Sequence, residues 1–276
     1  MSAAELIESA AVRLRAAGVS KPRREAHRLW AWLNRVSPGE AYLTREQAIA
    51  RDVAEAFGEA VARRLAGEPL AYVLGHAGVR HQEILCDARA LIPRPETEGV
   101  IDHALQRIQQ GSALDLGTGT GCLALALSQE GRFDAIIAVD LSDAALALAR
   151  ENARRTGQRV EFVQGDFGAG LRHGSFDLVV ANPPYLTEAE FAMLDAAVRD
   201  WEPQLALVSG ADGLEATRRV LLDANRLLAP SGTLVMELDS TRSGKVAALA
   251  AEAGYREVAV WDDLFGRPRY LTACRG

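Results

Sequence analysis

Apolar residues recur at helical spacing from the start of the chain. Ser2 and Glu5 have the spacing of a capping box, in which each side chain bonds the backbone N–H of the other residue. Gly18 is a typical residue to end the helix that follows. The sequence therefore predicts a first helix between these signals, with an apolar face formed by Ile7, Ala10, Ala11 and Leu14.

Two more helices are predicted before residue 67. Pro22 suits the first turn of a second helix, which would run to about Asn34, and Thr44 is a candidate cap for a third. No alternation of period two appears in this stretch, so residues 1–66 predict a small helical bundle. The apolar positions of the third helix are Ala54, Phe57, Val61 and Leu65.

Residues 67–96 differ from the bundle in composition. Tyr72–Leu74 and Glu83–Leu85 are short strand-like runs, and glycine or proline residues flank them. This pattern predicts a linker that contains a β-hairpin. The flanking residues are Gly67, Pro69, Gly75, Gly78, Pro93 and Pro95.

Residues 97–276 alternate between short apolar runs and helical segments. Buried runs that alternate with helices are typical of a doubly wound, mostly parallel sheet, so we expect an α/β domain with a Rossmann-like, seven-stranded sheet. The last two runs lack a full helix between them and predict an antiparallel hairpin at the edge. The predicted strands are Ala113–Leu114, Ala135–Val139, Phe162–Val163, Leu178–Ala181, Leu234–Met236, Val258–Trp261 and Tyr270–Ala273; the predicted helices include Val100–Ile108, Ala144–Arg154 and Leu214–Leu228.

Composition narrows the class of protein. Hydrophobic residues make up 49% of the 276 positions and charged residues 25%, which is typical of a globular protein with a substantial core. No apolar run approaches the roughly 18 residues of a membrane-spanning helix, and the N-terminus lacks the pattern of a secretory signal. Cys86, Cys122 and Cys274 are far apart, which favours a reducing cytoplasm over a disulfide framework or zinc site.

Charge is unevenly distributed along the chain. Residues 1–67 carry 11 basic and 8 acidic side chains, whereas the net charge of the whole chain is −6. Enzymes that act on nucleic acids usually present a basic patch, because phosphate neutralisation supplies much of their affinity. No basic run is present, which argues against a polynucleotide substrate. The five histidines show no metal-ligand spacing, so no metal site is predicted.

A glycine-rich loop follows the first strand of the predicted sheet. Such a loop lets a ligand approach the backbone and directs helix-terminal N–H groups toward it. The Gly-x-Gly-x-Gly spacing differs from the pyrophosphate fingerprint, and Asp115 precedes the loop. A carboxylate there suits S-adenosyl-L-methionine, which is cationic; the alternative is a tight turn with no ligand. The residues predicted to bind this cofactor are Asp115, Gly117, Thr118, Gly119, Thr120 and Gly121.

Two more acidic residues follow the next strands. Asp140 ends the second strand, where a carboxylate can accept hydrogen bonds from ribose hydroxyls. Asp166 and Phe167 follow the third strand and are placed to contact an adenine, although a Gly-Asp pair can also simply end a strand. These residues extend the predicted cofactor site.

The tetrad Asn182-Pro183-Pro184-Tyr185 follows the fourth strand. The prolines fix the backbone, so that the side-chain oxygen of Asn182 and the carbonyl of Pro183 can point to one spot. Both are hydrogen-bond acceptors and suit an NH₂ group, whose nitrogen lone pair would then face a methyl donor. Asn182 and Pro183 are therefore the predicted catalytic residues, and Tyr185 is predicted to stack on the substrate. The alternative is a structural Pro-Pro turn.

The chain resembles the HemK/PrmC family of glutamine methyltransferases, which modify peptide chain release factors. The resemblance covers nearly the whole chain and is carried by the glycine loop, Asp140, the tetrad and the motifs Glu68–Gly75, Leu91–Glu98, Glu202-Pro203 and Gly210–Leu214. The tetrad is shared with N6-adenine methyltransferases, so a DNA or RNA adenine methyltransferase remains the alternative function, with a non-catalytic binding protein as a further one.

The resemblance implies a class I methyltransferase domain over residues 97–276, with 1–66 docking a release factor as protein substrate. It implies that Asn182, with the loop and Asp140, contacts the cofactor, and that Asn182–Tyr185 hold the substrate glutamine of a Gly-Gly-Gln motif. We expect a monomer without nucleic acid or membrane partners. This chain has Phe167 where the family often has Trp, and Arg94 and Glu96 either form salt bridges or line the pocket.

Overall fold

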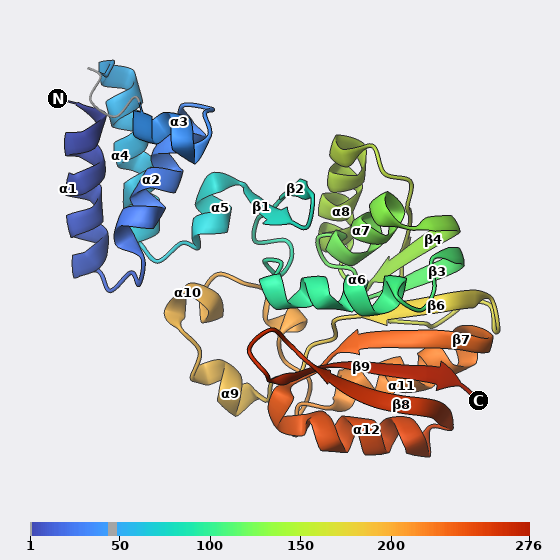
Figure 1. Ribbon diagram of the computed structural model, residues 1–276. Coiled ribbons are helices and arrows are strands. Elements are labelled where there is room, and N and C mark those ends of the chain that lie inside the picture. The colour runs from blue at the N-terminus through green and yellow to red at the C-terminus, as the bar shows by residue number, and fades with distance from the viewer. Residues whose placement is uncertain (1, 44–48) are drawn as a thin grey trace. The chain divides into compact units, whose positions relative to one another are not determined.

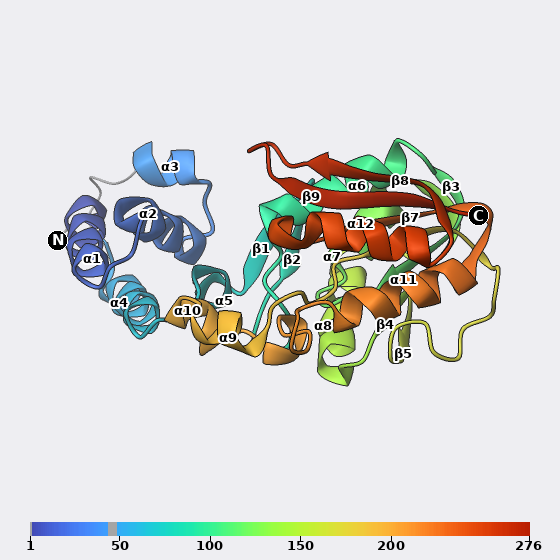
Figure 2. The ribbon, with the colours of Figure 1, turned by 90° about the horizontal axis from the view of Figure 1, so that it is seen from below.

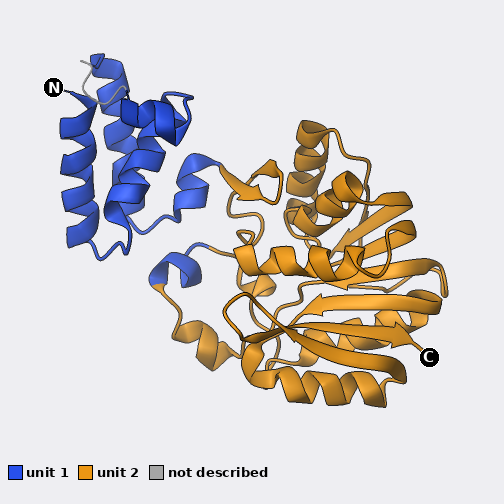
Figure 3. Cartoon of the chain, viewed as in Figure 1, with its two compact units in different colours: residues 1–75, 196–201 blue, residues 76–195, 202–276 orange. Residues whose placement is uncertain are grey.

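A computed structural model describes residues 2–43 and 49–276. The chain divides into two compact units (Figure 3). The first unit contains residues 1–75 and 196–201, and the second contains residues 76–195 and 202–276. The first unit thus extends past residue 66, through the start of the segment that sequence reasoning treats as a linker.

The first unit is helical and has its own apolar core. The capping box is present: Ser2 N donates to Glu5 Oε2 at 2.7 Å, and Glu5 N donates to Ser2 Oγ at 3.3 Å. Trp30 packs edge-on against Phe57, with ring centroids 5.5 Å apart. In the described part of this unit the helices are α1 (Ala3–Ala16), α2 (Pro22–Leu33), α3 (Pro38–Leu43), α4 (Arg51–Leu65), α5 (Leu70–Leu74) and α10 (Ala196–Arg199) (Figure 1).

Of two sequence expectations for this unit, one falls on residues that are not described and the other is wrong. Thr44, the expected cap of the third helix, lies outside the described residues, and α4 begins at Arg51. The prediction of a strand at Tyr72–Leu74 is wrong, because these residues form α5. Pro69 starts this helical turn with its carbonyl, which accepts from Tyr72 N and Val73 N, and Gly75 ends it with a φ of +75°. Burial of the three side chains overrides their strand propensity.

The predicted hairpin lies at the start of the second unit. Its strands are β1 (His76–Val79) and β2 (Gln82–Leu85), paired antiparallel. The buried side chain of Asn152 joins it to the glycine loop: Asn152 Oδ1 accepts from Leu85 N at 2.6 Å, and Asn152 Nδ2 donates to the carbonyl oxygens of Leu85 and Thr120. The hairpin is therefore fixed to the body of the unit.

A seven-stranded sheet forms the centre of the second unit, as expected. Its spatial order is β5-β4-β3-β6-β7-β9-β8, and all neighbouring strands are parallel except for the pairs that include β9. The predicted antiparallel hairpin at the edge is thus confirmed. The strands are β3 (Gln110–Leu116), β4 (Arg132–Asp140), β5 (Glu161–Gln164), β6 (Phe176–Ala181), β7 (Leu228–Glu237), β8 (Tyr255–Asp262) and β9 (Pro268–Arg275).

Helices cover both faces of this sheet. Alternate residues of β6 point to opposite faces: Val179 packs toward α11 and α12, whereas Leu178 and Val180 pack toward α6 and α7. Figures 1 and 2 show α11 and α12 side by side along the sheet. The α-helices of the second unit are α6 (Glu98–Leu105), α7 (Cys122–Glu130), α8 (Asp143–Thr156), α9 (Glu188–Ala192), α11 (Glu215–Leu227) and α12 (Ser243–Glu252).

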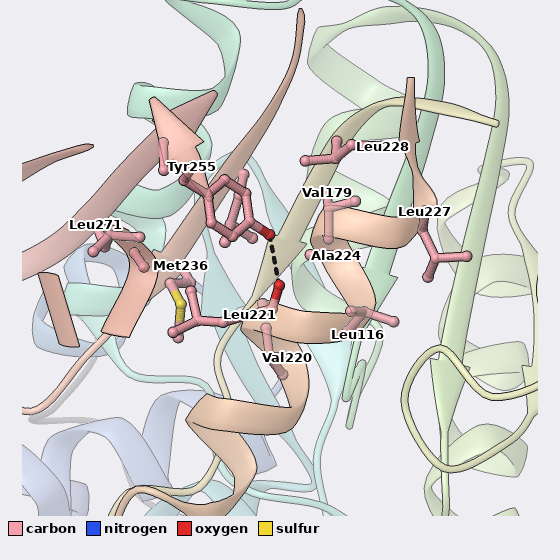
Figure 4. Packing of buried hydrophobic residues seen from close by; sticks show 14 of the residues in the cluster. Leu116, Val179, Val220, Leu221, Ala224, Leu227, Leu228, Met236, Tyr255 and Leu271 are labelled. Atoms are coloured by element: carbon pink, nitrogen blue, oxygen red, sulfur yellow. Dashed lines mark hydrogen bonds between the residues drawn. The ribbon is translucent and has the colours of Figure 1, made fainter. Parts of the chain in front are cut away.

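An apolar core of the second unit lies between α11 and the sheet. Val220, Leu221 and Ala224 are at most 1% exposed and pack against the strands (Figure 4). The hydroxyl of Tyr255 donates to the carbonyl of Leu221 at 2.8 Å, which satisfies a polar group inside this core. The core fixes the position of the parallel strands whose carboxyl ends carry the site.

The strand order reverses between β3 and β6. The chain continues from β3 to β4 and β5 on one side, and from β6 to β7 on the other. The carboxyl ends of such neighbouring parallel strands leave a crevice in which ligands of open α/β sheets bind. The glycine loop follows β3 and the Asn182 tetrad follows β6, so the topology brings both predicted motifs to this crevice.

Candidate active site

The glycine loop between β3 and α7 needs glycine at three positions. Gly117, Gly119 and Gly121 have φ of +77°, +56° and +86°, a left-handed conformation that other residues adopt at a cost. Gly121 also lies so close to Ala149 that a Cβ at position 121 would be 3.2 Å from the Cβ of Ala149. The loop is therefore shaped by backbone geometry, and it leaves the N-terminus of α7 facing the crevice.

Asp140 holds this loop from the neighbouring strand. Its Oδ2 accepts from Gly119 N at 2.8 Å, and its Oδ1 accepts from Ser142 N at 2.9 Å. The carboxylate is half-buried and lines the cavity. Each oxygen keeps a second lone pair, so Asp140 can accept two more hydrogen bonds from a ligand such as a ribose diol.

Asp115 lies beneath the loop and is fully buried. Its Oδ2 accepts from Thr118 Oγ1 at 2.6 Å and from Ala124 N at 3.3 Å, whereas its Oδ1 has no partner among the described residues. Burial, opposed by the Thr118 hydrogen bond, raises the pKa of Asp115 to about 7. The residue does not line the cavity. A cationic ligand above the loop would favour its ionised form.

Phe167 and Asp166 follow β5, as the sequence indicates. Phe167 has a φ of +49° and its ring lies beside Gly117, where it lines the cavity. A left-handed conformation at a phenylalanine is uncommon and is held here by its surroundings. Asp166 also lines the cavity and accepts from Arg219 Nη2 at 3.2 Å. Both residues therefore line the same cavity as the glycine loop.

Cys122 opens α7 at the edge of the same cavity. Burial raises the pKa of its thiol to about 12, with the charge of Asp115 as the next contribution. A thiol that stays protonated is a weak nucleophile. Cys122 therefore contributes a small side chain to the start of the helix.

The Asn182 side chain is oriented by a buried hydroxyl. Asn182 Nδ2 donates to Thr97 Oγ1 at 3.1 Å, and Thr97 Oγ1 donates to Glu237 Oε2 at 2.6 Å. Asn182 Oδ1 has no hydrogen-bond partner among the described residues. Asn182 lines the cavity, so this oxygen is available to a ligand.

The other three residues of the tetrad differ in their exposure to the cavity. Pro184 lines the cavity, whereas Pro183 is buried and Tyr185 is half-buried outside the lining. Burial raises the pKa of Tyr185 to about 12, so the phenol stays neutral. Leu186 then pairs with Val208 in a short parallel bridge. This bridge fixes the tetrad to the segment from Pro203 to Gly210, which forms another wall of the cavity.

Arg94 has both of the roles that the sequence left open. Its Nη2 donates to Glu202 Oε1 at 2.5 Å, and it also lines the cavity. Glu202 Oε2 accepts from Ile92 N at 3.0 Å, and the Glu202 side chain is 1% exposed. Glu202 thus secures the segment that carries Thr97. Glu96 is absent from the lining, and its backbone carbonyl accepts from the hydroxyl of Tyr270.

The cavity has a volume of about 380 Å³, within the usual range for small-molecule sites. Of the thirteen predicted site residues, nine line it: Gly117, Thr118, Gly119, Thr120, Asp140, Asp166, Phe167, Asn182 and Pro184. Asp115, Gly121, Pro183 and Tyr185 are not among the residues that line it. Sequence reasoning missed Thr97 and Glu237. An acid at the carboxyl end of a central strand was the signal that could have found Glu237.

The described residues contain neither a metal-binding cluster nor a membrane-spanning helix. No group of three or more His, Cys, Asp or Glu side chains there could hold a metal ion. None of the described helices is long and apolar enough to cross a membrane.

Family models match two parts of the chain. The model described as a methyltransferase small domain matches residues 97–202, and the model described as a PrmC N-terminal domain matches residues 5–75. The structure is also similar to that of the T. thermophilus 16S rRNA N2 G1207 methyltransferase in complex with AdoMet and guanosine. The TM-score is 0.54 at 18% identity, covering 73% of this chain and 50% of that chain. The second unit therefore has the class I methyltransferase fold.

Full-length relatives share more of the sequence. A release factor glutamine methyltransferase of Nitratidesulfovibrio vulgaris is 40% identical, over 98% of this chain and 94% of the relative. A protein of the same name from Deinococcus radiodurans is 39% identical, over 100% of this chain and 99% of the relative. Because this similarity spans both units, the chain belongs to the release factor glutamine methyltransferase family.

Proposed function

We propose that the chain transfers a methyl group from S-adenosyl-L-methionine to the side-chain amide nitrogen (N5) of the glutamine in the Gly-Gly-Gln motif of peptide chain release factors. The observation that supports this most directly is the unpaired Oδ1 of Asn182. Asn182 lines the same cavity as Asp140 and Phe167, whose side chains suit a nucleoside. Family membership supports release factors as the substrate class.

The cofactor fits the residues that line the cavity. Asp140 has free lone pairs for the ribose hydroxyls, Phe167 lines the cavity as an apolar contact for the adenine, and the glycine loop leaves room for close approach. Asp115, with an orphaned oxygen beneath the loop, supplies negative potential that suits a cation. When bound, the cofactor supplies an electrophilic methyl group on a sulfonium.

The acceptor pair of the tetrad orients the substrate amide. Asn182 Oδ1 and the carbonyl of Pro183 each accept one N–H of the glutamine NH₂ group. Both N–H bonds then lie in one plane, and the nitrogen lone pair is directed along its normal. The same acceptors stabilise the positive charge that develops on nitrogen during transfer, before the proton is lost. Positioning and electrostatics therefore provide the catalysis, without a covalent enzyme intermediate.

The environment of Tyr185 suits a neutral, flat substrate group. Its phenol stays protonated because burial raises its pKa to about 12. We propose that its ring covers the face of the amide opposite the methyl donor. A glutamine side chain in a glycine-rich loop is narrow and flexible enough to enter such a site.

The helical bundle of residues 1–66 is proposed to dock the folded release factor. The apolar core of the described part of the first unit is separate from that of the second, so the bundle can be devoted to recognition. We further propose that the chain acts as a monomer in the cytoplasm, where translation terminates.

The test is methyl transfer by the full-length protein. With radiolabelled S-adenosyl-L-methionine, purified release factor should be labelled, whereas a release factor with asparagine in place of the Gly-Gly-Gln glutamine should not. Duplex and single-stranded nucleic acids serve as the competing acceptors. Label on adenine with none on release factor would overturn the proposal in favour of an N6-adenine methyltransferase.

A further inference from the structure

Three residues from distant parts of the sequence form a hydrogen-bonded chain, and two of them, Thr97 and Asn182, line the cavity. Thr97 precedes α6, Asn182 follows β6, and Glu237 ends β7. The Thr97 hydroxyl lies 3.1 Å from Asn182 Nδ2 and 2.6 Å from Glu237 Oε2. Thr97 is 4% exposed and Glu237 is 1% exposed, so water does not compete for these bonds.

The available protons determine which group donates in each of these two hydrogen bonds. A threonine hydroxyl has a single proton, and an ionised carboxylate can only accept. When Glu237 is ionised, Thr97 therefore donates to it, and the remaining lone pairs of Thr97 can only accept from Asn182. The nitrogen of the Asn182 amide must face Thr97, and the oxygen must face the cavity. With the amide reversed, its oxygen would meet a lone pair of Thr97, and its NH₂ group would meet the substrate.

We propose that Thr97 and Glu237 are positioning residues that fix the orientation of the Asn182 amide, so that it presents an acceptor to the substrate nitrogen. Neither residue is required to touch the reacting nitrogen. The consequence for catalysis rests on the proposed function, since only a substrate that donates N–H bonds needs this orientation. A reversed amide would present N–H groups to the substrate NH₂, and two donors do not bond.

Burial and nearby charges determine the pH range in which Glu237 is ionised and can only accept the hydrogen bond from Thr97. Burial raises the pKa of Glu237, while the Thr97 hydrogen bond and Arg269, whose Nη1 lies 3.9 Å from Glu237 Oε1, oppose the rise. As the pH falls through this pKa, the carboxyl gains a proton and no longer requires the proton of Thr97. The turnover number should therefore fall on the acid side. The other titratable groups that act electrostatically on Glu237 are Arg94, Glu96, Cys122, Tyr185 and Tyr270.

Hydrogen exchange of the Asn182 side chain tests the orientation without any methyl acceptor. In ¹⁵N-labelled full-length protein, the Asn182 NH₂ signal is assigned by its loss in Asn182→Ala. We expect its protons to exchange slowly in the wild type and at least about 10-fold faster in Thr97→Val, which keeps the shape but removes the hydroxyl. Equal exchange rates in the two proteins would overturn the inference.

Turnover tests the consequence for catalysis. At saturating concentrations of both substrates, Thr97→Val should lower kcat by about 10- to 100-fold, whereas Thr97→Ser should restore most of it. Glu237→Gln should lower kcat less, because its amide oxygen still accepts from Thr97, and should remove the acid limb of the pH profile. Thr233→Val is the matched control, because Thr233 is also a buried threonine but lies within β7, and it should leave kcat unchanged.

Cofactor affinity distinguishes a positioning role of Thr97 and Glu237 from general disruption of the site by the substitutions. Calorimetry should give wild-type affinity for S-adenosyl-L-methionine in Thr97→Val, Thr97→Ser and Glu237→Gln. A serine variant as impaired as the valine variant, or a kcat of Thr97→Val within about twofold of the wild type, would contradict the inference. A wild type that shows the protected Asn182 amide but methylates no glutamine would instead refute the proposed function.

Discussion

The carboxylate of Asp140 accepts a hydrogen bond from the backbone N–H of Gly119 at 2.8 Å. The end of β4 thereby holds the glycine loop that follows the neighbouring strand β3. The same carboxylate faces the cavity, so one side chain both shapes the loop and remains available to a ligand.

Asp140→Ala should weaken the binding of S-adenosyl-L-methionine by about 10- to 100-fold. The variant loses the proposed ribose acceptor and leaves Gly119 N without its partner, and a lost hydrogen bond of this kind costs about 1–3 kcal/mol. Isothermal titration calorimetry measures the effect. Asp143→Ala is the matched control, because Asp143 is an exposed acid at the start of α8. An unchanged affinity in Asp140→Ala would exclude Asp140 from the cofactor site.

Asp115→Asn should make the protein more stable above neutral pH and weaken its affinity for the cofactor. Burial raises the pKa of Asp115 from 3.8 to about 7, so between these values the folded protein holds a proton that the unfolded chain has released. The free energy of unfolding therefore falls as the pH rises through this window. Asparagine removes this dependence and the unpaired charge.

Denaturant unfolding without cofactor checks the stability effect of Asp115→Asn. The advantage of the variant over the wild type should be large at about pH 8 and smaller at about pH 5. A difference in stability that is the same at both pH values would show that Asp115 does not titrate in this range.

Glu202→Ala should destabilise the protein and reduce turnover together. The buried carboxylate joins Arg94 and the backbone of Ile92, so its loss frees the segment that carries Thr97. The expected loss of stability is about 1–3 kcal/mol, read from thermal unfolding. Glu55→Ala removes an exposed ion pair on α4 and should change the midpoint little. Full turnover in Glu202→Ala would show that catalysis does not depend on the bonds between Glu202 and the segment that carries Thr97.

Most elements of the fold follow from local patterns in the sequence. Apolar runs such as Leu178–Ala181 are buried on both faces of the sheet, as expected for a central parallel strand covered by helices. The interpretation failed at Tyr72–Leu74, because a short apolar run fits a strand or a buried helical turn equally well. At these residues the tertiary environment determined that the run forms a helical turn.

The candidate site was only partly predictable for a related reason. The motifs at Gly117–Gly121 and Asn182–Tyr185 are continuous in sequence and could be recognised. Thr97 lies 140 residues from Glu237 and 85 residues from Asn182, and only the folded sheet brings their side chains together. The sequence also did not distinguish cavity-lining residues from those behind the lining, such as Asp115.

Removal of residues 1–66 should abolish methylation of whole release factor while leaving most of the cofactor affinity. The cavity is lined entirely by residues of the second unit, whereas the bundle is the proposed docking site. Filter-binding of labelled methyl groups and calorimetry measure the two properties. Activity on release factor that is indifferent to the deletion would remove the docking role from the bundle.

The most direct measurement is tandem mass spectrometry of release factor after reaction with the wild type and with Asn182→Ala at full cofactor occupancy. The wild type should place one methyl group on the side-chain amide nitrogen of the Gly-Gly-Gln glutamine. In single-turnover reactions Asn182→Ala should do so at least about 10-fold more slowly, because one of the two acceptors is gone. A methyl group on another residue, or equal rates for the two proteins, would contradict the assignment of this site to glutamine methylation.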